Sequence, residues 1–303
     1  MYDIEALYEA ASLDDALDLL EEHPEAKIIA GGSDVLIEIR EGKLSGCTLV
    51  SIQKLDELRG IASEKDGTIR IGALESFSHI ARSGIIRGGI FALAEAAGVI
   101  GGPQLRNIAT IGGNVCNGVT SADSASTLMA YDAVMEYRGK DGVRLVPIRE
   151  HYVSAGKTSL KHGEILTAVL VPKASWENRW GHYIKYAMRE ALDIATLGCS
   201  ANVRLSPGKK TIEELRLAYG VAGPVPMRSP QAEKAAEGKA ASEETIAAAA
   251  RAALKDIQPR TSWRASKELR LQIAFELAKR TIRESVRRAG GASDLKEERG
   301  GPA

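Results

Sequence analysis

Two glycine-bearing stretches constrain this chain more than any other feature. Residues 30–34 read Ala-Gly-Gly-Ser-Asp and residues 110–114 read Thr-Ile-Gly-Gly-Asn. Each follows or interrupts an apolar run rich in β-branched residues, as where a strand opens into a loop. Glycine lacks a Cβ, so it permits positive φ and lets an anion approach the backbone amides. Two such loops predict a long ligand with two phosphates held between two subdomains, which favours a dinucleotide.

A Gly-Gly pair is more often a simple turn, so the surroundings decide its interpretation. Ser33 and Asp34 add a hydroxyl and a helix cap beside the first pair. The second stretch continues into a polar run just before a predicted helix at residues 124–131: Asn114, Asn117, Thr120, Ser121 and Asp123. Polar side chains with exposed amides at a helix start suit a diphosphate. No G-x-G-x-x-G pattern is present, which disfavours a nicotinamide enzyme of the doubly wound type.

The charge balance and the cysteines exclude several classes of function. The 40 basic and 40 acidic residues cancel, which removes the electrostatic argument for a nucleic-acid or membrane partner. No apolar run reaches the length of a membrane span, and the acidic first nine residues indicate no export signal. Cys47, Cys116 and Cys199 form no C-x-x-C pair. We therefore expect a reduced cytoplasmic protein without a metal or cluster of its own.

The order of predicted elements indicates an α+β protein of several units. Strands and helices mix in the first part, with strands expected at residues 27–30, 48–52, 68–71, 132–137, 144–147 and 165–171. Three strands at 183–188, 195–205 and 215–221 then precede three helices at 229–237, 243–255 and 267–287. This order predicts domains at residues 1–58, 59–175 and 176–287. Residues 288–303, rich in glycine and charge, are expected to form a disordered tail.

Three local features have ordinary interpretations. Lys185 alternates with aromatic residues in a predicted strand, where an exposed position is the commoner outcome. Cys116 has no nearby histidine in the sequence to act as a base, so we interpret it as a packing residue. Gly156-Lys157-Thr158 mimics the end of a phosphate-binding P-loop, but His151 stands where that motif needs its first glycine.

Three segments together resemble the FAD-binding subunit of molybdenum hydroxylases. They are Lys-Ile-Ile-Ala-Gly-Gly-Ser-Asp-Val-Leu at 27–36, Arg-Asn-Ile-Ala-Thr-Ile-Gly-Gly-Asn at 106–114 and Ser-Ala-Asp-Ser at 121–124. Within that family the chain looks most like the separate flavin subunit of bacterial xanthine dehydrogenases. Tyr-Ile-Lys-Tyr-Ala-Met-Arg at 183–189 and Ser-Trp-Arg-Ala-Ser-Lys at 262–267 extend the resemblance to about Arg287.

The resemblance implies a fold of the vanillyl-alcohol-oxidase (PCMH) type. Two α+β subdomains would enclose FAD, and a C-terminal α+β domain of three strands and helices would follow. Carried over position by position, the resemblance implies these FAD contacts: Lys27, Ile28, Ile29, Ala30, Gly31, Gly32, Ser33, Asp34, Val35, Leu36, Ala109, Thr110, Gly113, Asn114, Asn117, Asp123, Leu166 and Lys185. Larger single-chain relatives carry an aromatic residue where this chain has Ala155-Gly156, a difference that bears on where NAD would sit.

The resemblance also implies an electron relay among several subunits. A large subunit with a molybdenum cofactor would hydroxylate a purine or related heterocycle, and a small subunit with [2Fe–2S] clusters would pass the electrons on. FAD in this chain would then reduce NAD, with no catalytic side chain required. One alternative is the FAD subunit of another molybdenum hydroxylase, acting on an aldehyde, nicotinate, carbon monoxide or an aromatic acyl-CoA. Another is a non-catalytic module that binds a nucleotide or assembles a complex.

Overall fold

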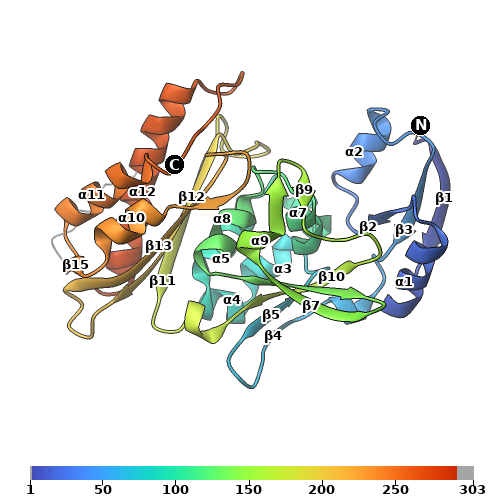
Figure 1. The fold of residues 1–303 in the computed structure, drawn as a ribbon, viewed down its shortest axis with the longest axis horizontal. Coiled ribbons are helices and arrows are strands. Elements are labelled where there is room, and N and C mark those ends of the chain that lie inside the picture. The colour runs from blue at the N-terminus through green and yellow to red at the C-terminus, as the bar shows by residue number, and fades with distance from the viewer. Residues whose placement is uncertain (1, 292–303) are drawn as a thin grey trace.

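The computed structural model describes residues 2–291. Figure 1 shows three units arranged in chain order along the longest axis, from the blue N-terminal unit through the green central unit to the orange C-terminal unit. Each unit has its own cluster of buried apolar side chains, around Leu17 and Val50, around Ile71 and Phe77, and around Leu217. We therefore propose the predicted boundaries, near residues 58 and 175, as domain boundaries.

The first unit is a small parallel sheet with two helices. Its elements are β1 (Ile4–Glu9), α1 (Leu13–Glu22), β2 (Lys27–Ile29), α2 (Val35–Arg40), β3 (Cys47–Ser51) and the 3-10 turn η1 (Asp56–Leu58). The strand order is β1-β3-β2. Ser12 begins α1, and its hydroxyl accepts a hydrogen bond from the Asp15 amide at 3.1 Å, as expected of an N-cap. The first glycine stretch connects β2 to α2.

The second unit is an antiparallel sheet with short helices on one side of it (Figure 1). The sheet order is β4-β5-β10-β6-β7. The strands, with a separate hairpin β8–β9, are β4 (Ile61–Ser63), β5 (Ile69–Gly72), β6 (Val134–Gly139), β7 (Gly142–Pro147), β8 (Tyr152–Ser154), β9 (Lys157–Thr158) and β10 (Ile165–Val171). The helices are α3 (Phe77–Arg82), α4 (Gly84–Gly89), α5 (Phe91–Gly98), α6 (Pro103–Ile108), α7 (Ile111–Cys116), α8 (Asp123–Ala130) and α9 (Ile148–His151).

The third unit is an antiparallel sheet covered by helices on both faces. After the 3-10 turn η2 (Lys173–Ser175), its strands are β11 (Trp180–Tyr186), β12 (Leu197–Leu205), β13 (Thr211–Gly220), β14 (Met227–Arg228) and β15 (Lys239–Ala240). Its helices are α10 (Pro230–Ala236), α11 (Glu243–Ala253) and α12 (Lys267–Arg288). Helices α10 and α12 pack on this sheet, and α5 and α8 of the second unit also contact it. The three predicted strands followed by three helices are present, with shifted ends.

A charged junction holds the second unit to the third. Glu95 on α5 accepts hydrogen bonds from His182 Nδ1 at 2.9 Å, from the Tyr183 amide at 3.1 Å and from Arg288 Nη2 at 2.6 Å. Arg288 is the last residue of α12, so the predicted tail at 288–303 begins with a helical residue. Ala289 is buried, and its amide and that of Gly290 bond back to the last turn of α12. Residues 292–303 of the predicted tail lie outside the described residues. None of the helices in the described part of the chain combines the length and hydropathy needed to cross a bilayer.

One local prediction is wrong, because the second glycine stretch is a helix and not an open loop. Thr110 is the N-cap of α7, and its hydroxyl accepts a hydrogen bond from the Gly113 amide at 3.1 Å. A Cβ at Gly112 would lie 2.7 Å from the Ala73 carbonyl oxygen. Glycine is therefore required there for close packing of the helix against Ala73, the residue after β5, and the cap compensates for its poor helix propensity.

Candidate functional site

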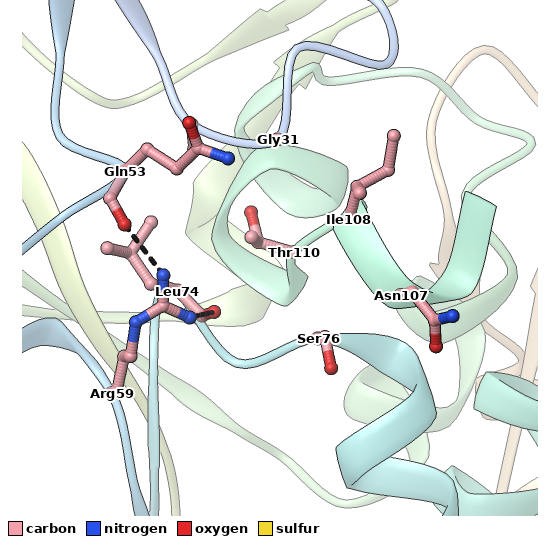
Figure 2. Close-up of a pocket in the computed structure, with 9 residues that line it drawn as sticks. Gly31, Gln53, Arg59, Leu74, Ser76, Asn107, Ile108 and Thr110 are labelled. Atoms are coloured by element: carbon pink, nitrogen blue, oxygen red, sulfur yellow. Dashed lines mark hydrogen bonds between the residues drawn. The ribbon is translucent and has the colours of Figure 1, made fainter. Parts of the chain in front are cut away.

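The two glycine stretches meet in space. A Cβ built on Gly31 would lie 1.9 Å from the carbonyl oxygen of Ile108 and 3.3 Å from Cα of Ala109. The loop after β2 therefore crosses the end of α6 in backbone contact, as Figure 2 shows for Gly31 and Ile108. Gly32 has φ of +70°, a left-handed conformation that favours glycine. These two glycines serve different purposes, since one permits close approach and the other permits the turn.

The backbone amides of the first stretch are available to a ligand. Within residues 2–291, the amides of residues 31–34 donate no hydrogen bond to another protein group. The second stretch differs, because its amides are engaged: Ile111 with the Glu75 carbonyl, Gly112 with the Ala73 carbonyl, Gly113 with Thr110 Oγ1 and Asn114 with the Thr110 carbonyl. The expectation of exposed amides at both stretches is therefore wrong for the second. That segment provides an exposed glycine surface at Gly113 and polar side chains instead.

Asp34 and Asn117 link the first stretch to the end of α7. Burial and the neighbouring Glu38 raise the pKa of Asp34, while a hydrogen bond from the Asn117 side chain opposes them. Asp34 also occupies the N-cap position of α2, as the sequence predicts, although its side chain makes no capping hydrogen bond. Its carboxylate is therefore directed to the second unit, and these two predicted residues come together.

Asp123 and Lys185 form a buried pair where α8 meets β11. Lys185 Nζ lies 2.8 Å from Asp123 Oδ2, and the Tyr183 hydroxyl donates to Asp123 Oδ1 at 2.8 Å. The side chains of Asp123 and Lys185 are 8% and 9% exposed. Burial raises the pKa of Asp123, and the lysine and tyrosine oppose that rise. The ordinary interpretation of Lys185 as an exposed strand position is therefore wrong.

Asn114 connects α7 to this pair. Its side-chain oxygen accepts a hydrogen bond from Ser124 Oγ at 2.6 Å, and Ser124 is the neighbour of Asp123 in α8. Separate polar contacts join Asp34 to Asn117, Asn114 to Ser124 and Asp123 to Lys185, and these predicted residues come from all three units.

A small cavity of about 70 Å³ lies beside the crossing of the two stretches. Its lining includes Gly31 and Thr110 and several residues that sequence reasoning missed: Gln53, Arg59, Leu74, Ser76, Asn107 and Ile108. Arg59 donates to the carbonyls of Leu74 at 3.1 Å and Gln53 at 2.6 Å (Figure 2). Arg59 and Gly31 thus line the same cavity. Residues 107 and 108 lay inside a recognised motif, whereas nothing in the sequence singled out Arg59.

Among the predicted residues, Ala30, Gly31 and Thr110 line that cavity and the others do not. Leu166 is 4% exposed in the middle of the second sheet, paired with Tyr137 across β10 and β6. Lys27 is exposed at the start of β2, at the opposite end of the strand from Gly31. The remaining predicted residues of the first stretch, Ile28, Ile29, Ala30, Ser33, Val35 and Leu36, lie on β2, in the loop or in the first turn of α2.

The cysteine and the histidine nearest the site are not poised for catalysis. Burial raises the pKa of the Cys116 thiol to about 12, which agrees with a packing role. His151 is fully buried and contacts the Val115 carbonyl oxygen through Nε2 at 2.9 Å, and burial lowers its pKa. Gly156 lies in the turn between β8 and β9 with φ of +72°, so a P-loop is excluded there. The groups of the site can bind a ligand and fix its orientation.

Comparisons with known proteins define the family. Residues 2–174 match the model of the FAD binding domain in molybdopterin dehydrogenase, and residues 182–285 match the CO dehydrogenase flavoprotein C-terminal domain. The chain is 45% identical to the xanthine dehydrogenase FAD-binding subunit of Escherichia coli O157:H7, over 96% of this chain and 99% of that protein. It is 30% identical to the carbon monoxide dehydrogenase medium chain of Hydrogenophaga pseudoflava, over 85% and 88%.

A solved structure supports the same assignment. Carbon monoxide dehydrogenase from Hydrogenophaga pseudoflava, in a form lacking the Mo-pyranopterin moiety, matches with a TM-score of 0.89 and 29% identity, over 95% of this chain and 99% of that one. The chain belongs to the family of FAD-binding subunits of the molybdenum hydroxylases, and it has their PCMH-type fold. It is accordingly a subunit of an oxidoreductase of the xanthine dehydrogenase kind.

The residues present fit the cofactor of this family. The loop at 31–34 offers unpaired donors, and any side chain at position 31 would collide with Ile108 in the crossing that shapes the loop. Backbone amides with fixed directions and a guanidinium both donate hydrogen bonds to phosphate oxygens, so these groups are suited to bind a diphosphate. The first stretch, Thr110 and Arg59 are therefore the groups that would hold this part of FAD.

Proposed function

We propose that this chain is the FAD-binding electron-transfer subunit of a xanthine dehydrogenase. The observation that supports this most is the run of free amides at 31–34, held against Ile108 within a chain 45% identical to a xanthine dehydrogenase FAD-binding subunit. Identity to the carbon monoxide and nicotinate dehydrogenase subunits is lower, at 30% and 32%. Bound FAD would supply two-electron and one-electron chemistry.

The chain's own residues bind and orient in this proposal. The amides of residues 31–34 and the Arg59 guanidinium meet the diphosphate, and Asn114 and Asn117 present amide side chains along α7. Asp123 and Lys185 shape the wall where the second and third units meet, and Leu166 would line another wall of the site. Lys27 to Leu36, Ala109, Thr110 and Gly113 complete the proposed contact set. The proton transfers of substrate hydroxylation would belong to the subunit that carries the molybdenum cofactor.

The proposal includes partners, an electron acceptor and a compartment. A large subunit would carry the molybdenum cofactor and a small subunit the [2Fe–2S] clusters, and NAD would accept the electrons. The complex would act in purine metabolism in the cytoplasm. Support for partners comes from relatives that are named as subunits or medium chains, and the scattered free cysteines suit a reducing compartment.

The test is to purify the tagged chain with its co-purifying subunits and to follow the flavin absorbance. We expect yellow protein that releases FAD on denaturation, and bleaching of the flavin by xanthine in the absence of NAD. Recovery of the absorbance on adding NAD would identify the acceptor. Bleaching by nicotinate, an aldehyde or carbon monoxide but not by xanthine would assign the chain to another enzyme of the family. Colourless protein that takes up no added FAD would contradict the proposal as a whole.

A further inference from the structure

The segment before α12 is not explained by the flavin site. Residues 260–270 bring together three arginines, Arg260, Arg264 and Arg270. Burial lowers the pKa of Arg270, and the positive charges of Arg260 and Arg264 lower it further. Lys267 adds another positive charge, while the carboxylate of Glu268 is held by its own amide and by Ser266 at the helix start. The segment therefore carries an excess of positive charge.

Arg270 is buried without a carboxylate partner among residues 2–291. It is 2% exposed, its Nη1 donates to the Thr196 carbonyl, its Nη2 donates to Ser262 Oγ at 2.8 Å, and its Nε has no partner. The other buried arginine in the described chain, Arg179, is 6% exposed and pairs with Glu214. An ionised group buried without a counter-charge is costly. No carboxylate among residues 2–291 therefore balances the charge of Arg270.

The exposed neighbours of Arg270, Ser262 and Thr196 in the chain have the composition of a binding hot spot. The Arg264 guanidinium lies 4.2 Å from the ring centre of Trp263, and Trp263 is 76% exposed. Leu269, next to Arg270, and Ile194, two residues before Thr196, are 43% and 51% exposed. Tryptophan and arginine are enriched among residues that dominate binding energy, especially beside groups that become fully desolvated.

We propose that residues 260–270 form a docking surface for an acidic segment of a partner subunit. A carboxylate of that segment pairs with Arg264 and Arg260, and thereby neutralises the charge buried at Arg270. Trp263, Leu269 and Ile194 cover the apolar part of the same segment. A carboxylate matches the forked guanidinium donors, and its charge complements the excess of the loop. This inference rests on the proposed function, which supplies the partner subunits.

The test uses the full chain and its purified partner subunits. Arg264→Glu reverses the charge, Trp263→Ala removes the aromatic contact, and Arg251→Glu, on the exposed surface of α11, is the matched control. We expect Arg264→Glu to weaken the affinity for the partner subunits about 30-fold or more, and Trp263→Ala to weaken it about 10-fold. The control should change it less than about 2-fold. FAD content and thermal midpoint of each isolated variant should match the wild type, because these side chains lie outside the proposed FAD contacts.

Different results separate the inference from the proposed function. Wild-type affinity in both Arg264→Glu and Trp263→Ala, with FAD retained, would overturn the docking surface and leave the flavin assignment standing. So would stabilisation of the wild type, but not of Arg264→Glu, by inorganic phosphate with unchanged subunit affinity, since the loop would then be a small-anion site. A wild-type chain that takes up neither FAD nor the partner subunits would contradict the proposed function itself.

Discussion

Replacing Gly31 with alanine tests the crossing of the two glycine stretches most directly. The new Cβ would lie 1.9 Å from the Ile108 carbonyl oxygen, whereas ordinary contact begins at 3.4 Å. The two backbones must therefore separate by about 1.5 Å, because neither contacting group is a flexible side chain. A displacement of that size breaks hydrogen bonds aimed at a fixed ligand. A hydrogen bond to a charged group contributes about 1.5–3 kcal/mol, so losing two of them costs about 3–6 kcal/mol.

The expected result is a large loss of FAD affinity. By the relation of 1.4 kcal/mol for each factor of ten, that loss is roughly 10²-fold to 10⁴-fold. Fluorescence quenching of added FAD by apo-protein measures it, and urea unfolding measures stability in parallel. Overpacking by one methyl group adds a destabilisation of about 1–3 kcal/mol. Gly32→Leu should also prevent binding, because Gly32 has φ of +70° and its Cβ would lie 3.0 Å from Leu36.

Gly42 provides the matched control. It has φ of +76° and nothing within 4 Å of a Cβ, so alanine there introduces backbone strain without a collision. We expect Gly42→Ala to cost about 1–2 kcal/mol of stability and to leave FAD affinity unchanged. If Gly31→Ala bound FAD as tightly as the wild type, the crossing would not shape the binding site, and the reasoning would be refuted.

Three further measurements address the remaining groups. Lys185→Met should destabilise the protein by about 3–5 kcal/mol in urea unfolding, since Asp123 would be left as an uncompensated buried carboxylate; an unchanged unfolding free energy would show that the pair is not buried. Burial alone would raise the pKa of Glu214, but hydrogen bonds from two arginines outweigh it and lower the pKa to about 2. The stabilisation by Glu214 is therefore full above pH 4.5 and is lost as the pH falls towards 2, so Glu214→Gln should flatten the acid side of a plot of thermal midpoint against pH. Iodoacetamide at about pH 8 should modify Cys47 and spare Cys199, which is fully buried and whose pKa burial raises to about 12; rapid modification of Cys199 would contradict its burial.

Local signals predicted most elements because they depend on neighbours in the chain. The cap at Ser12 and the long amphipathic helix α12 required only residues a few positions apart. Helix α7 could not be predicted this way, because two glycines disfavour a helix. Its stability depends on the Thr110 cap and on close packing of Gly112 against Ala73. The latter contact joins residues 39 positions apart, which no pattern around Gly112 reveals.

In the candidate site, too, neighbours in the chain predicted some residues, whereas others depend on tertiary contacts. The glycine stretches and the polar run that includes Asp123 were visible in the sequence, whereas the resemblance alone supplied Lys185 as a contact. Alternation with aromatic residues predicted an exposed lysine, whereas Lys185 pairs with Asp123 on another unit. Arg59 reaches the cavity because two backbone carbonyls hold its guanidinium. Sequence reasoning missed it because that orientation is set by tertiary contacts alone.

The charge arrangement explains why glycine, and not a cluster of lysines, marks this site. Lys185 is paired with Asp123, and Arg59, which lines the cavity together with Gly31, lies 3.6 Å from Asp56. A diphosphate placed there would be met chiefly by neutral amides whose direction is fixed by the backbone. Amide donors act when the phosphate comes close to the backbone, and they do not require a net positive charge on the protein. The equal numbers of acidic and basic residues in the chain agree with this. Selectivity for the ligand would then depend on the separation of two backbones, which a single Cβ at position 31 is sufficient to alter.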